Sequence, residues 1–192
     1  MIKVIDDFLP KEVFKELQDY CYSNKFNIID AGEKQFSVLN IPEGLTDYFK
    51  PQGLTPVLGF IRNAYNGFDD DIRIHADNII NGEKTSVASV LYINKEEGVT
   101  ENGTCFYEHK TLGIELPKDC SDEEFDRLIR EDSNDKSKWK RLDYISSRPN
   151  RLLTYSSNYF HSKYPAKIEE GERIVLVCFY KDVSSDVQFG CI

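Results

Sequence analysis

From residue 72 onward the sequence is dominated by short β-rich runs that are separated by Asn, Gly, Pro and Glu. Short runs with turn-forming residues between them are typical of an antiparallel sandwich or barrel, because each run supplies one strand and each break supplies a turn. The predicted strands are residues 72–76, 86–93, 105–107, 144–145, 151–155 and 173–180. A mostly β domain is therefore the architecture that this pattern favours.

The first part of the chain adds one strand and two helices to this β-rich region. A strand is expected at 2–8 and a helix at 10–22, where apolar side chains recur on one helical face and Pro10 suits the first turn. A second helix is expected at 55–65, where apolar residues recur at the same spacing. The chain is thus expected to place its helices first and most of its strands afterwards.

One strongly charged stretch, residues 108–138, interrupts the β-rich half. It contains a helix that is predicted to start at Ser121, where Glu124 can complete a capping box. An insertion at the rim of a barrel is a candidate lid, and a solvated excursion without a role is an equal alternative. We expect it to be more mobile than the strands, because it is charged and poor in apolar anchors. No linker or repeat divides residues 1–192, which are expected to form one domain.

Composition excludes several classes of partner. The formal net charge of −9 opposes binding to a nucleic-acid backbone or to an anionic membrane surface. No apolar run approaches the roughly 20 residues that a membrane-spanning helix needs, and the N-terminus does not resemble a signal peptide. The 5 cysteines show no CxxC spacing, so free thiols in a reducing cytoplasm are the simplest interpretation.

A histidine and an aspartate, His75 and Asp77, are separated by a single residue. Residues two apart on a strand project from the same face, so the imidazole and the carboxylate are expected to lie side by side. They could supply two of the three ligands of a facial triad, the metal site typical of non-haem Fe(II) oxygenases. On its own, however, this pattern is common, and a surface pair is the better explanation.

The C-terminal part of the sequence supplies the third ligand and a candidate anion site. His161 follows the predicted strand 151–155, and Arg173 opens the apolar strand after it. An arginine at the head of so apolar a strand is costly to bury unless an anion pairs with it. A dicarboxylate would supply that anion.

Taken in order, these features resemble the 2-oxoglutarate- and Fe(II)-dependent dioxygenases, most closely their prolyl-hydroxylase-like branch. The resemblance extends over essentially the whole chain. Its motifs are residues 2–10 (IKVIDDFLP), 75–78 (HADN), 90–94 (VLYIN), 102–104 (NGT), 150–153 (NRLL), 161–165 (HSKYP) and Arg173. Each motif is modest, and their order and spacing together are specific.

The resemblance implies a fold, a cofactor and a reaction. The fold would be a double-stranded β-helix (jelly roll), mostly β, with N-terminal helices packed on one sheet. His75, Asp77 and His161 would bind Fe(II), and no further catalytic residue is implied. Arg173 would bind the distal carboxylate of the cosubstrate 2-oxoglutarate, which Tyr92 would also touch. Dioxygen would be the second substrate, succinate a product, and the reaction the hydroxylation of a small molecule or of a peptide or protein side chain.

One position departs from the family, and two other interpretations stay open. Val177 stands where the branch often has a hydroxyl residue, which puts one hydrogen bond to the cosubstrate in doubt. A cupin-like jelly roll can bind a metal without 2-oxoglutarate, and a jelly-roll protein can also be catalytically idle. Neither alternative needs a buried Arg173, so this residue discriminates between the three. His109 lies in the charged stretch and is not expected to bind metal.

Overall fold

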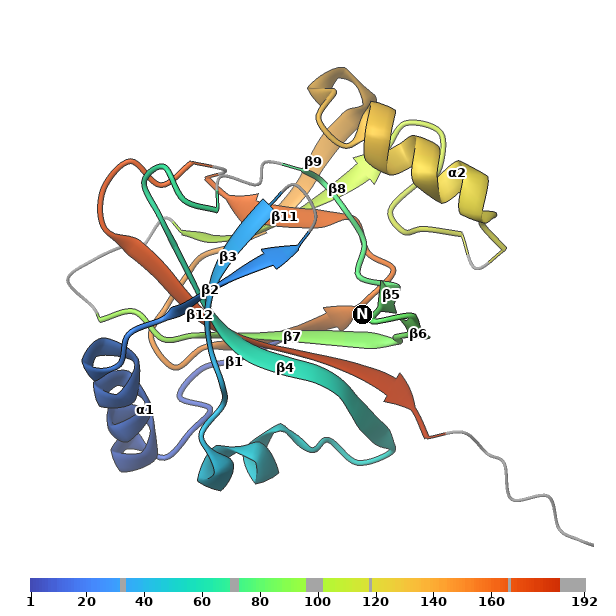
Figure 1. Cartoon of the computed structure of the whole chain (residues 1–192). Coiled ribbons are helices and arrows are strands. Elements are labelled where there is room, and N and C mark those ends of the chain that lie inside the picture. Colours follow the sequence, from blue (N-terminus) through green and yellow to red (C-terminus); the bar gives the residue numbers. More distant parts are fainter. Residues whose placement is uncertain (32–33, 70–72, 96–101, 118, 166, 184–192) are drawn as a thin grey trace, which may run out of the picture.

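The protein is described here by a computed structural model covering residues 1–31, 34–69, 73–95, 102–117, 119–165 and 167–183. Most of its strands form two antiparallel sheets, here called the major and the minor sheet (Figure 1). The major sheet contains, in spatial order, β1 (Ile2–Ile5), β10 (Leu152–Ser156), β7 (Val87–Tyr92), β12 (Glu172–Asp182), β4 (Leu54–Tyr65), β3 (Lys34–Leu39) and β2 (Asn27–Ala31). The minor sheet contains β11 (His161–Tyr164), β8 (Gly103–His109) and β9 (Trp139–Ile145).

The remaining elements are short helices and one small hairpin. They are α1 (Lys11–Ser23), the 3-10 helix η1 (Glu43–Phe49), the hairpin strands β5 (Ile79–Ile80) and β6 (Glu83–Lys84), α2 (Asp122–Arg127), the π-helical turn η2 (Leu128–Asp132) and the 3-10 turn η3 (Lys136–Lys138). This is the mostly β, antiparallel architecture of a jelly roll, as the sequence predicted. No helix in the described ranges is long and apolar enough to cross a membrane.

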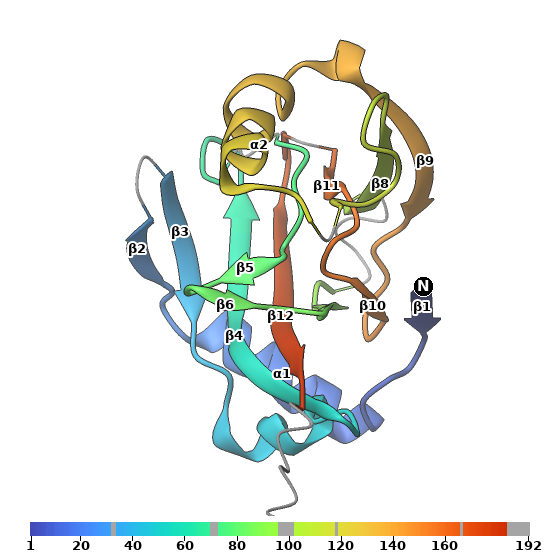
Figure 2. The same ribbon diagram turned by 90° about the vertical axis from the view of Figure 1, so that its right-hand side faces the viewer.

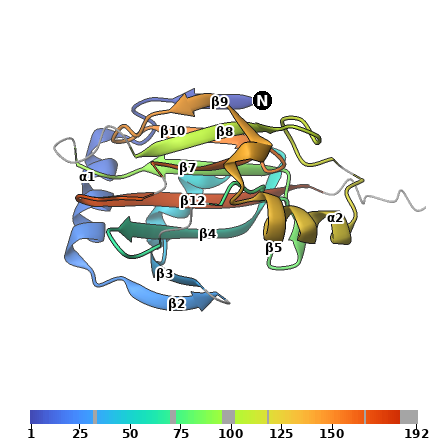
Figure 3. The same ribbon diagram turned by 90° about the horizontal axis from the view of Figure 1, so that it is seen from above.

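The two faces of the major sheet bury two separate hydrophobic clusters. Along β12, Ile174, Leu176 and Cys178 face one cluster, which also contains Leu17 of α1. Val175, from the same strand, belongs to a second cluster on the opposite face. This alternation is the two-residue period of a strand that is covered on both faces. Figure 3 shows α1 crossing the strands of the major sheet near one end, so this helix packs on one sheet as expected.

The second predicted helix, at 55–65, is wrong. This segment is β4, which pairs with β12 from Leu54 to Tyr65 and is thus a central strand. Its apolar residues fit a strand as well as a helix, and Pro56 and Gly59 both disfavour a helix interior. A methyl group at Gly59 would lie 3.0 Å from the sulfur of Cys178 on β12. Close pairing between the two strands therefore decides the conformation.

The charged stretch 108–138 includes the end of β8 and the connection from β8 to β9, and the capping box predicted at Ser121 and Glu124 is present at the start of α2. The expectation that this stretch is poor in apolar anchors is wrong. Leu116 and Leu128 are each 2% exposed. They join a third hydrophobic cluster, whose other buried members are Ile74, Ala76, Trp139 and Phe160. Figure 2 shows α2 at the same end of the molecule as the minor sheet.

The cysteines in the described part of the chain, Cys21, Cys105, Cys120 and Cys178, are free thiols, as expected. Burial raises the pKa of Cys21 to about 12 and that of Cys178 to about 11. Both thiols therefore stay protonated and act as small core residues. Cys191 lies outside the described residues.

Candidate metal centre

The two histidines of the predicted triad are held together by their own backbones. The amide of His75 donates to the carbonyl of His161 at 3.0 Å, and the reverse bond measures 2.9 Å. The strand predicted at 72–76 is reduced to this single bridge, and residue 72 lies outside the described part. Asp77 is fixed separately, since its amide donates to the carbonyl of Ser157 at 2.7 Å. Backbone bonds thus place all three side chains at the edge of the minor sheet.

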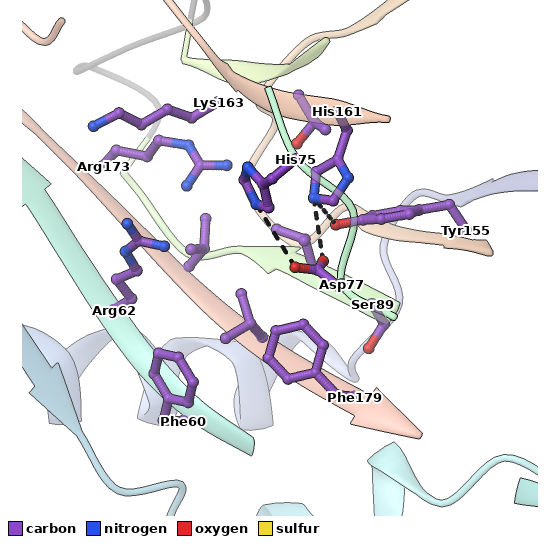
Figure 4. Close-up of a pocket in the computed structure, with 14 residues that line it drawn as sticks. Phe60, Arg62, His75, Asp77, Ser89, Tyr155, His161, Lys163, Arg173 and Phe179 are labelled. Atoms are coloured by element: carbon purple, nitrogen blue, oxygen red, sulfur yellow. Dashed lines mark hydrogen bonds and ion pairs between the residues drawn. The ribbon is translucent and has the colours of Figure 1, made fainter. Parts of the chain in front are cut away.

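The three side chains converge as a facial triad requires. One ligand atom from each of His75, Asp77 and His161 lies within 4.8 Å of the other two. The carboxylate of Asp77 is 3.2 Å from Nε2 of His161 and 3.6 Å from Nε2 of His75 (Figure 4). Two neutral imidazoles and a carboxylate are the donor set that suits Fe(II) in a facial triad.

Backbone carbonyls fix the orientation of both imidazole rings. Nδ1 of His75 lies 3.0 Å from the carbonyl of Arg73, and Nδ1 of His161 lies 2.9 Å from the carbonyl of Tyr159. A ring that donates from Nδ1 presents the lone pair of Nε2 to the site, which is how histidine ligands are commonly oriented. The Nε2 atoms of both rings thus face the Asp77 carboxylate.

The charges at the triad depend on one another. Burial favours the neutral form of Asp77, but His161, His75 and Arg62 outweigh it and hold the pKa of the carboxyl below its usual value. Burial of His161 likewise opposes its protonation, yet the Asp77 carboxylate holds the pKa of this imidazole above its usual value. An anionic carboxylate is therefore present at neutral pH, ready to bind a cation.

A pocket of about 80 Å³ opens next to the triad. By this measure it can hold several waters or one small ligand, since a single water needs roughly 10–15 Å³. Its lining residues are Phe60, Arg62, His75, Asp77, Ser89, Val90, Thr104, Tyr155, His161, Lys163, Arg173, Val175, Val177 and Phe179 (Figure 4). The lining brings the predicted Arg173 and the predicted triad into one cavity.

Arg173 is a buried cation without a carboxylate partner among the described residues. It is 7% exposed, and its Nε has no hydrogen-bond partner in the described part of the protein. No described carboxylate lies within 4.0 Å of its guanidinium, which sits 5.6 Å above the ring of Tyr92. Burial lowers the pKa of this arginine. Buried donors are rarely left unsatisfied, so the site favours an anionic ligand that accepts from Arg173.

Tyr92 lies next to this arginine, with its ring centre 5.6 Å from the guanidinium carbon. Its side chain is fully buried, and its hydroxyl lies 2.8 Å from Oγ1 of Thr104, which does line the pocket. Tyr92 itself is not among the lining residues, so direct contact with a cosubstrate stays a prediction. Val177 lines the pocket with an apolar side chain, which agrees with the departure noted in the sequence.

Three charged residues of the pocket region were missed by the sequence analysis. Arg62, on β4, makes a bidentate ion pair with Asp69, and the ammonium of Lys163 donates to the backbone carbonyl of Asp69. Lys163 could have been found, because it lies two residues after His161 on the same strand. Arg62 lies on the same face of β4 as Phe60. It was missed because the segment was predicted to be a helix, in which residues two apart do not share a face.

The third histidine, His109, is packed in the protein interior. His109 is 3% exposed and packs against Trp139 at a ring-centroid distance of 4.6 Å. Its Nε2 lies 3.2 Å from a carboxylate oxygen of Asp132, while Nδ1 faces the amide of Leu112 at 3.2 Å. It is not part of the cluster of potential ligands found in the described residues.

Comparison with protein families gives one match. The profile of a family described as "Family of unknown function (DUF6445)" matches residues 73–174, which is more than half of the chain. The chain belongs to the DUF6445 family. The matched region of this DUF6445 protein includes the triad and Arg173. None of the curated proteins matches it.

The DUF6445 protein shares its fold with solved 2-oxoglutarate- and Fe(II)-dependent oxygenases. HygX from Streptomyces hygroscopicus with iron bound is 13% identical, with a TM-score of 0.60 over 95% of this chain and 82% of that chain. A prolyl-4-hydroxylase from Pseudomonas putida is 13% identical, with a TM-score of 0.54 over 94% and 92% of the two chains. A viral collagen prolyl hydroxylase from Paramecium Bursaria Chlorella virus-1 is 10% identical, with a TM-score of 0.51 over 95% and 96%. The chain therefore shares its fold with members of the prolyl-hydroxylase branch.

Proposed function

We propose that this DUF6445 protein is a 2-oxoglutarate-dependent Fe(II) dioxygenase that hydroxylates its substrate. The bound iron would couple oxidative decarboxylation of 2-oxoglutarate to succinate with oxidation of the substrate by dioxygen. His75, Asp77 and His161 would hold the metal through two Nε2 atoms and one carboxylate. Arg173 would hold the distal carboxylate of the cosubstrate.

The observation that carries this proposal is the position of Arg173. A metal triad alone is shared with other jelly-roll proteins, whereas a buried guanidinium in the same pocket, with no carboxylate partner among the described residues, needs an anion. A guanidinium offers two parallel hydrogen bonds to a carboxylate, which a lysine cannot reproduce. HygX, which shares the fold, has been crystallised with nickel and 2-oxoglutarate bound. That structure supports the same cosubstrate here.

The residues of this chain would also shield the reaction from water. Asp77 is 9% exposed, His161 5% and Arg173 7%. A cosubstrate that spans them would replace pocket water and strengthen each charge interaction through the lower local dielectric. Thr104 offers a hydroxyl to the pocket, and Arg62 offers a second guanidinium.

The test is binding of Fe(II) and of 2-oxoglutarate under anaerobic conditions. We expect the wild type with both ligands to develop a weak visible charge-transfer band, which arises only if the cosubstrate chelates the metal. Losing a hydrogen bond to a charged group costs roughly 1.5–3 kcal/mol, so Arg173→Lys should weaken 2-oxoglutarate binding about 10- to 150-fold. Arg173→Leu should weaken it further, and both variants should retain Fe(II) affinity.

Two outcomes would redirect the assignment. Unchanged 2-oxoglutarate binding in Arg173→Leu rules out this anchor. Failure of the wild type to bind 2-oxoglutarate while it binds a metal favours the cupin-like or catalytically idle alternative. Once binding is established, release of succinate across a panel of small molecules and peptides identifies the substrate. HygX has been crystallised with hygromycin B and a prolyl-4-hydroxylase shares the fold, so both substrate classes belong in the panel.

A further inference from the structure

A second cavity, of about 430 Å³, lies between the minor sheet and the connection from β8 to β9. We call it the outer pocket. Its lining residues are Ile74, Tyr107, Ser133, Asn134, Lys136, Trp139, Arg141, Ser162, Lys163, Tyr164 and Pro165. Only Lys163 also lines the metal pocket. The two cavities therefore have almost separate walls.

Strand geometry places the outer pocket on the opposite side of β11 from the metal site. Successive side chains of a strand point to opposite faces, so Ser162 and Tyr164 face away from His161. On β8, Phe106 packs in the cluster between the two sheets, and its neighbour Tyr107 lines the outer pocket. The strand that carries a predicted metal ligand thus separates the two cavities.

Aromatic side chains form a fixed wall of the outer pocket. Trp139 is 8% exposed, and its Nε1 donates to the carbonyl of Asp132 at 2.7 Å. Tyr107 packs edge-on against it at a ring-centroid distance of 6.5 Å. The hydroxyl of Ser162 donates to the Tyr107 hydroxyl at 3.1 Å. These contacts hold the two rings in place before any ligand enters, which reduces the entropy lost on binding.

The charge of the outer pocket is opposite to that of the whole chain. Its lining contains Lys136, Arg141 and Lys163 but no Asp or Glu, in a protein with a formal net charge of −9. Among the described residues no carboxylate lies within 4.0 Å of the charged groups of Lys136 and Arg141. Two neighbouring lysines do have carboxylate partners: Lys138 pairs with Asp132, and Lys140 pairs with Glu108.

Arg141 is also held in position at the pocket. Its guanidinium carbon lies 5.4 Å from the centre of the Tyr164 ring, a cation–π contact. This contact leaves the in-plane N–H groups of the guanidinium available to an anionic acceptor. The wall thus presents an oriented cation next to the aromatic rings.

We propose that the outer pocket binds a small anion with a flat, apolar body. The carboxylate, sulfonate or phosphate group would accept from Arg141 and Lys136, and the flat body would lie against Trp139 and Tyr107. The volume falls within the range of about 300–1,000 Å³ that is usual for small-molecule sites. This site is independent of the metal, so it goes beyond the proposed oxygenase function and does not rest on it.

A matched pair of probes tests the charge preference on the full chain without metal. Isothermal titration calorimetry would compare naphthalene-2-sulfonate with the neutral naphthalene-2-sulfonamide, which has nearly the same shape. We expect one site with about 10-fold tighter binding of the sulfonate, the size of effect that one charge-assisted hydrogen bond contributes. Equal affinities, or no binding of the sulfonate, would overturn the proposal.

Substitutions locate the site. Arg141→Gln and Lys136→Gln each keep a polar side chain on an exposed position and should lower sulfonate affinity about 10-fold while leaving sulfonamide affinity unchanged. Lys140→Gln is the matched control, because it removes the same charge from the residue next to Arg141 and should change neither affinity. Unchanged sulfonate binding in both Arg141→Gln and Lys136→Gln contradicts the assignment.

A spectroscopic signal confirms the position independently. Trp139 is the only tryptophan in the sequence, so a ¹H–¹⁵N correlation spectrum contains one indole N–H resonance. Sulfonate bound in the outer pocket should shift this resonance in the wild type and in Lys140→Gln. Saturable binding without such a shift places the ligand elsewhere and overturns the proposal.

Discussion

The hydroxyl oxygen of Tyr155 lies 3.0 Å from Nε2 of His161, the nitrogen that faces the proposed metal site. Tyr155 is 3% exposed, and burial followed by the nearby Asp77 carboxylate raises the pKa of its phenol well above the usual value. The phenol therefore stays protonated. Above the pKa of His161, Nδ1 donates to the carbonyl of Tyr159, and the Tyr155 hydroxyl can donate to the lone pair of Nε2. The metal-free protein thus satisfies this nitrogen internally.

Substituting Tyr155 by phenylalanine removes a competitor for that lone pair. At a pH above the pKa of His161, we expect Tyr155→Phe to bind Ni(II), an air-stable probe, about fivefold more tightly. The free energy of unfolding of the metal-free protein should fall by about 1 kcal/mol, the net contribution of one hydrogen bond. Calorimetric metal titration and urea unfolding measure the two effects. Weaker metal binding by the variant would show instead that the hydroxyl positions the ligands.

Metal binding should depend on pH through His161. The Asp77 carboxylate, acting against burial, raises the pKa of His161 above the usual value of about 6.5. Below that raised pKa the metal must displace one proton, so its affinity should fall about tenfold for each pH unit. Above it, the affinity should be independent of pH. Titrations in two buffers of different ionisation enthalpy measure the protons released, whose number should rise as the pH falls below the pKa of His161.

The stability of the metal-free protein should follow the opposite trend. A histidine whose pKa is raised by folding adds stability below its unfolded pKa, and this contribution is lost as the pH rises through the folded pKa. The window therefore lies above about pH 6.5. Urea unfolding of the wild type and of His161→Gln over this range tests the expectation. The same pH dependence in both proteins would show that another group is responsible.

The two arginines of the metal pocket should contribute unequally to cosubstrate binding. Arg62 is neutralised by its bidentate contact with Asp69, whereas Arg173 has no described carboxylate within 4.0 Å. Arg173→Met, which removes the charge as Arg173→Leu does, should therefore weaken 2-oxoglutarate binding by more than the about 10- to 150-fold expected for Arg173→Lys. Removal of Arg62 should weaken it less than about tenfold.

The Arg62 variant needs a compensating change at its partner. The Asp69 side chain is 1% exposed, so loss of Arg62 alone would bury an unpaired charge and destabilise the fold by about 3–5 kcal/mol. Arg62→Met with Asp69→Asn avoids this, because asparagine tolerates the backbone φ of 58° at this position. Equal losses of affinity in the double variant and in Arg173→Met would assign both arginines to the cosubstrate.

The sequence predicted the β-rich architecture because its strands carry local signals. Apolar runs such as 86–93 and 173–180 are bounded by turn residues, and both correspond to strands of the structure. The segment 55–65 carried no decisive signal, since its apolar spacing fits two periods. Its conformation depends on pairing with β12, a partner more than a hundred residues away in sequence. Long-range pairing of this kind overrides local propensity.

The residues of the candidate site could be predicted from the sequence, but their arrangement in space could not. His75 and Asp77 were found because they lie two residues apart, and His161 and Arg173 because the order of motifs resembles a family. Their convergence in space rests on a backbone bridge between His75 and His161, which no local pattern encodes. The roles of these residues as metal and cosubstrate ligands stay predictions. The cations of the outer pocket, Lys136, Arg141 and Lys163, come from η3, β9 and β11, and no local sequence pattern indicates that they meet.

The connection from β8 to β9 should support the metal site through packing. Leu128 is 2% exposed and belongs to the same cluster as Ile74 and Ala76, the residues on either side of His75. The amide of Ile74 also donates to the carbonyl of Ser133, in the same connection, at 3.0 Å. This attachment argues against a free lid and predicts coupling between the connection and the metal.

Leu128→Ala should lower the free energy of unfolding by about 2–5 kcal/mol, the usual result of removing a buried leucine. Because the cavity lies next to the segment that carries His75, metal affinity of the folded variant should fall about tenfold. Leu17→Ala is the matched control. Leu17 is 1% exposed and packs on the far face of the major sheet, so its loss should cost similar stability and leave metal affinity unchanged. Urea unfolding and calorimetric titration with Ni(II) measure both quantities. Unchanged metal affinity in both variants would limit the connection to a structural role, and a loss of stability under about 0.5 kcal/mol in Leu128→Ala would show that the connection is not anchored there.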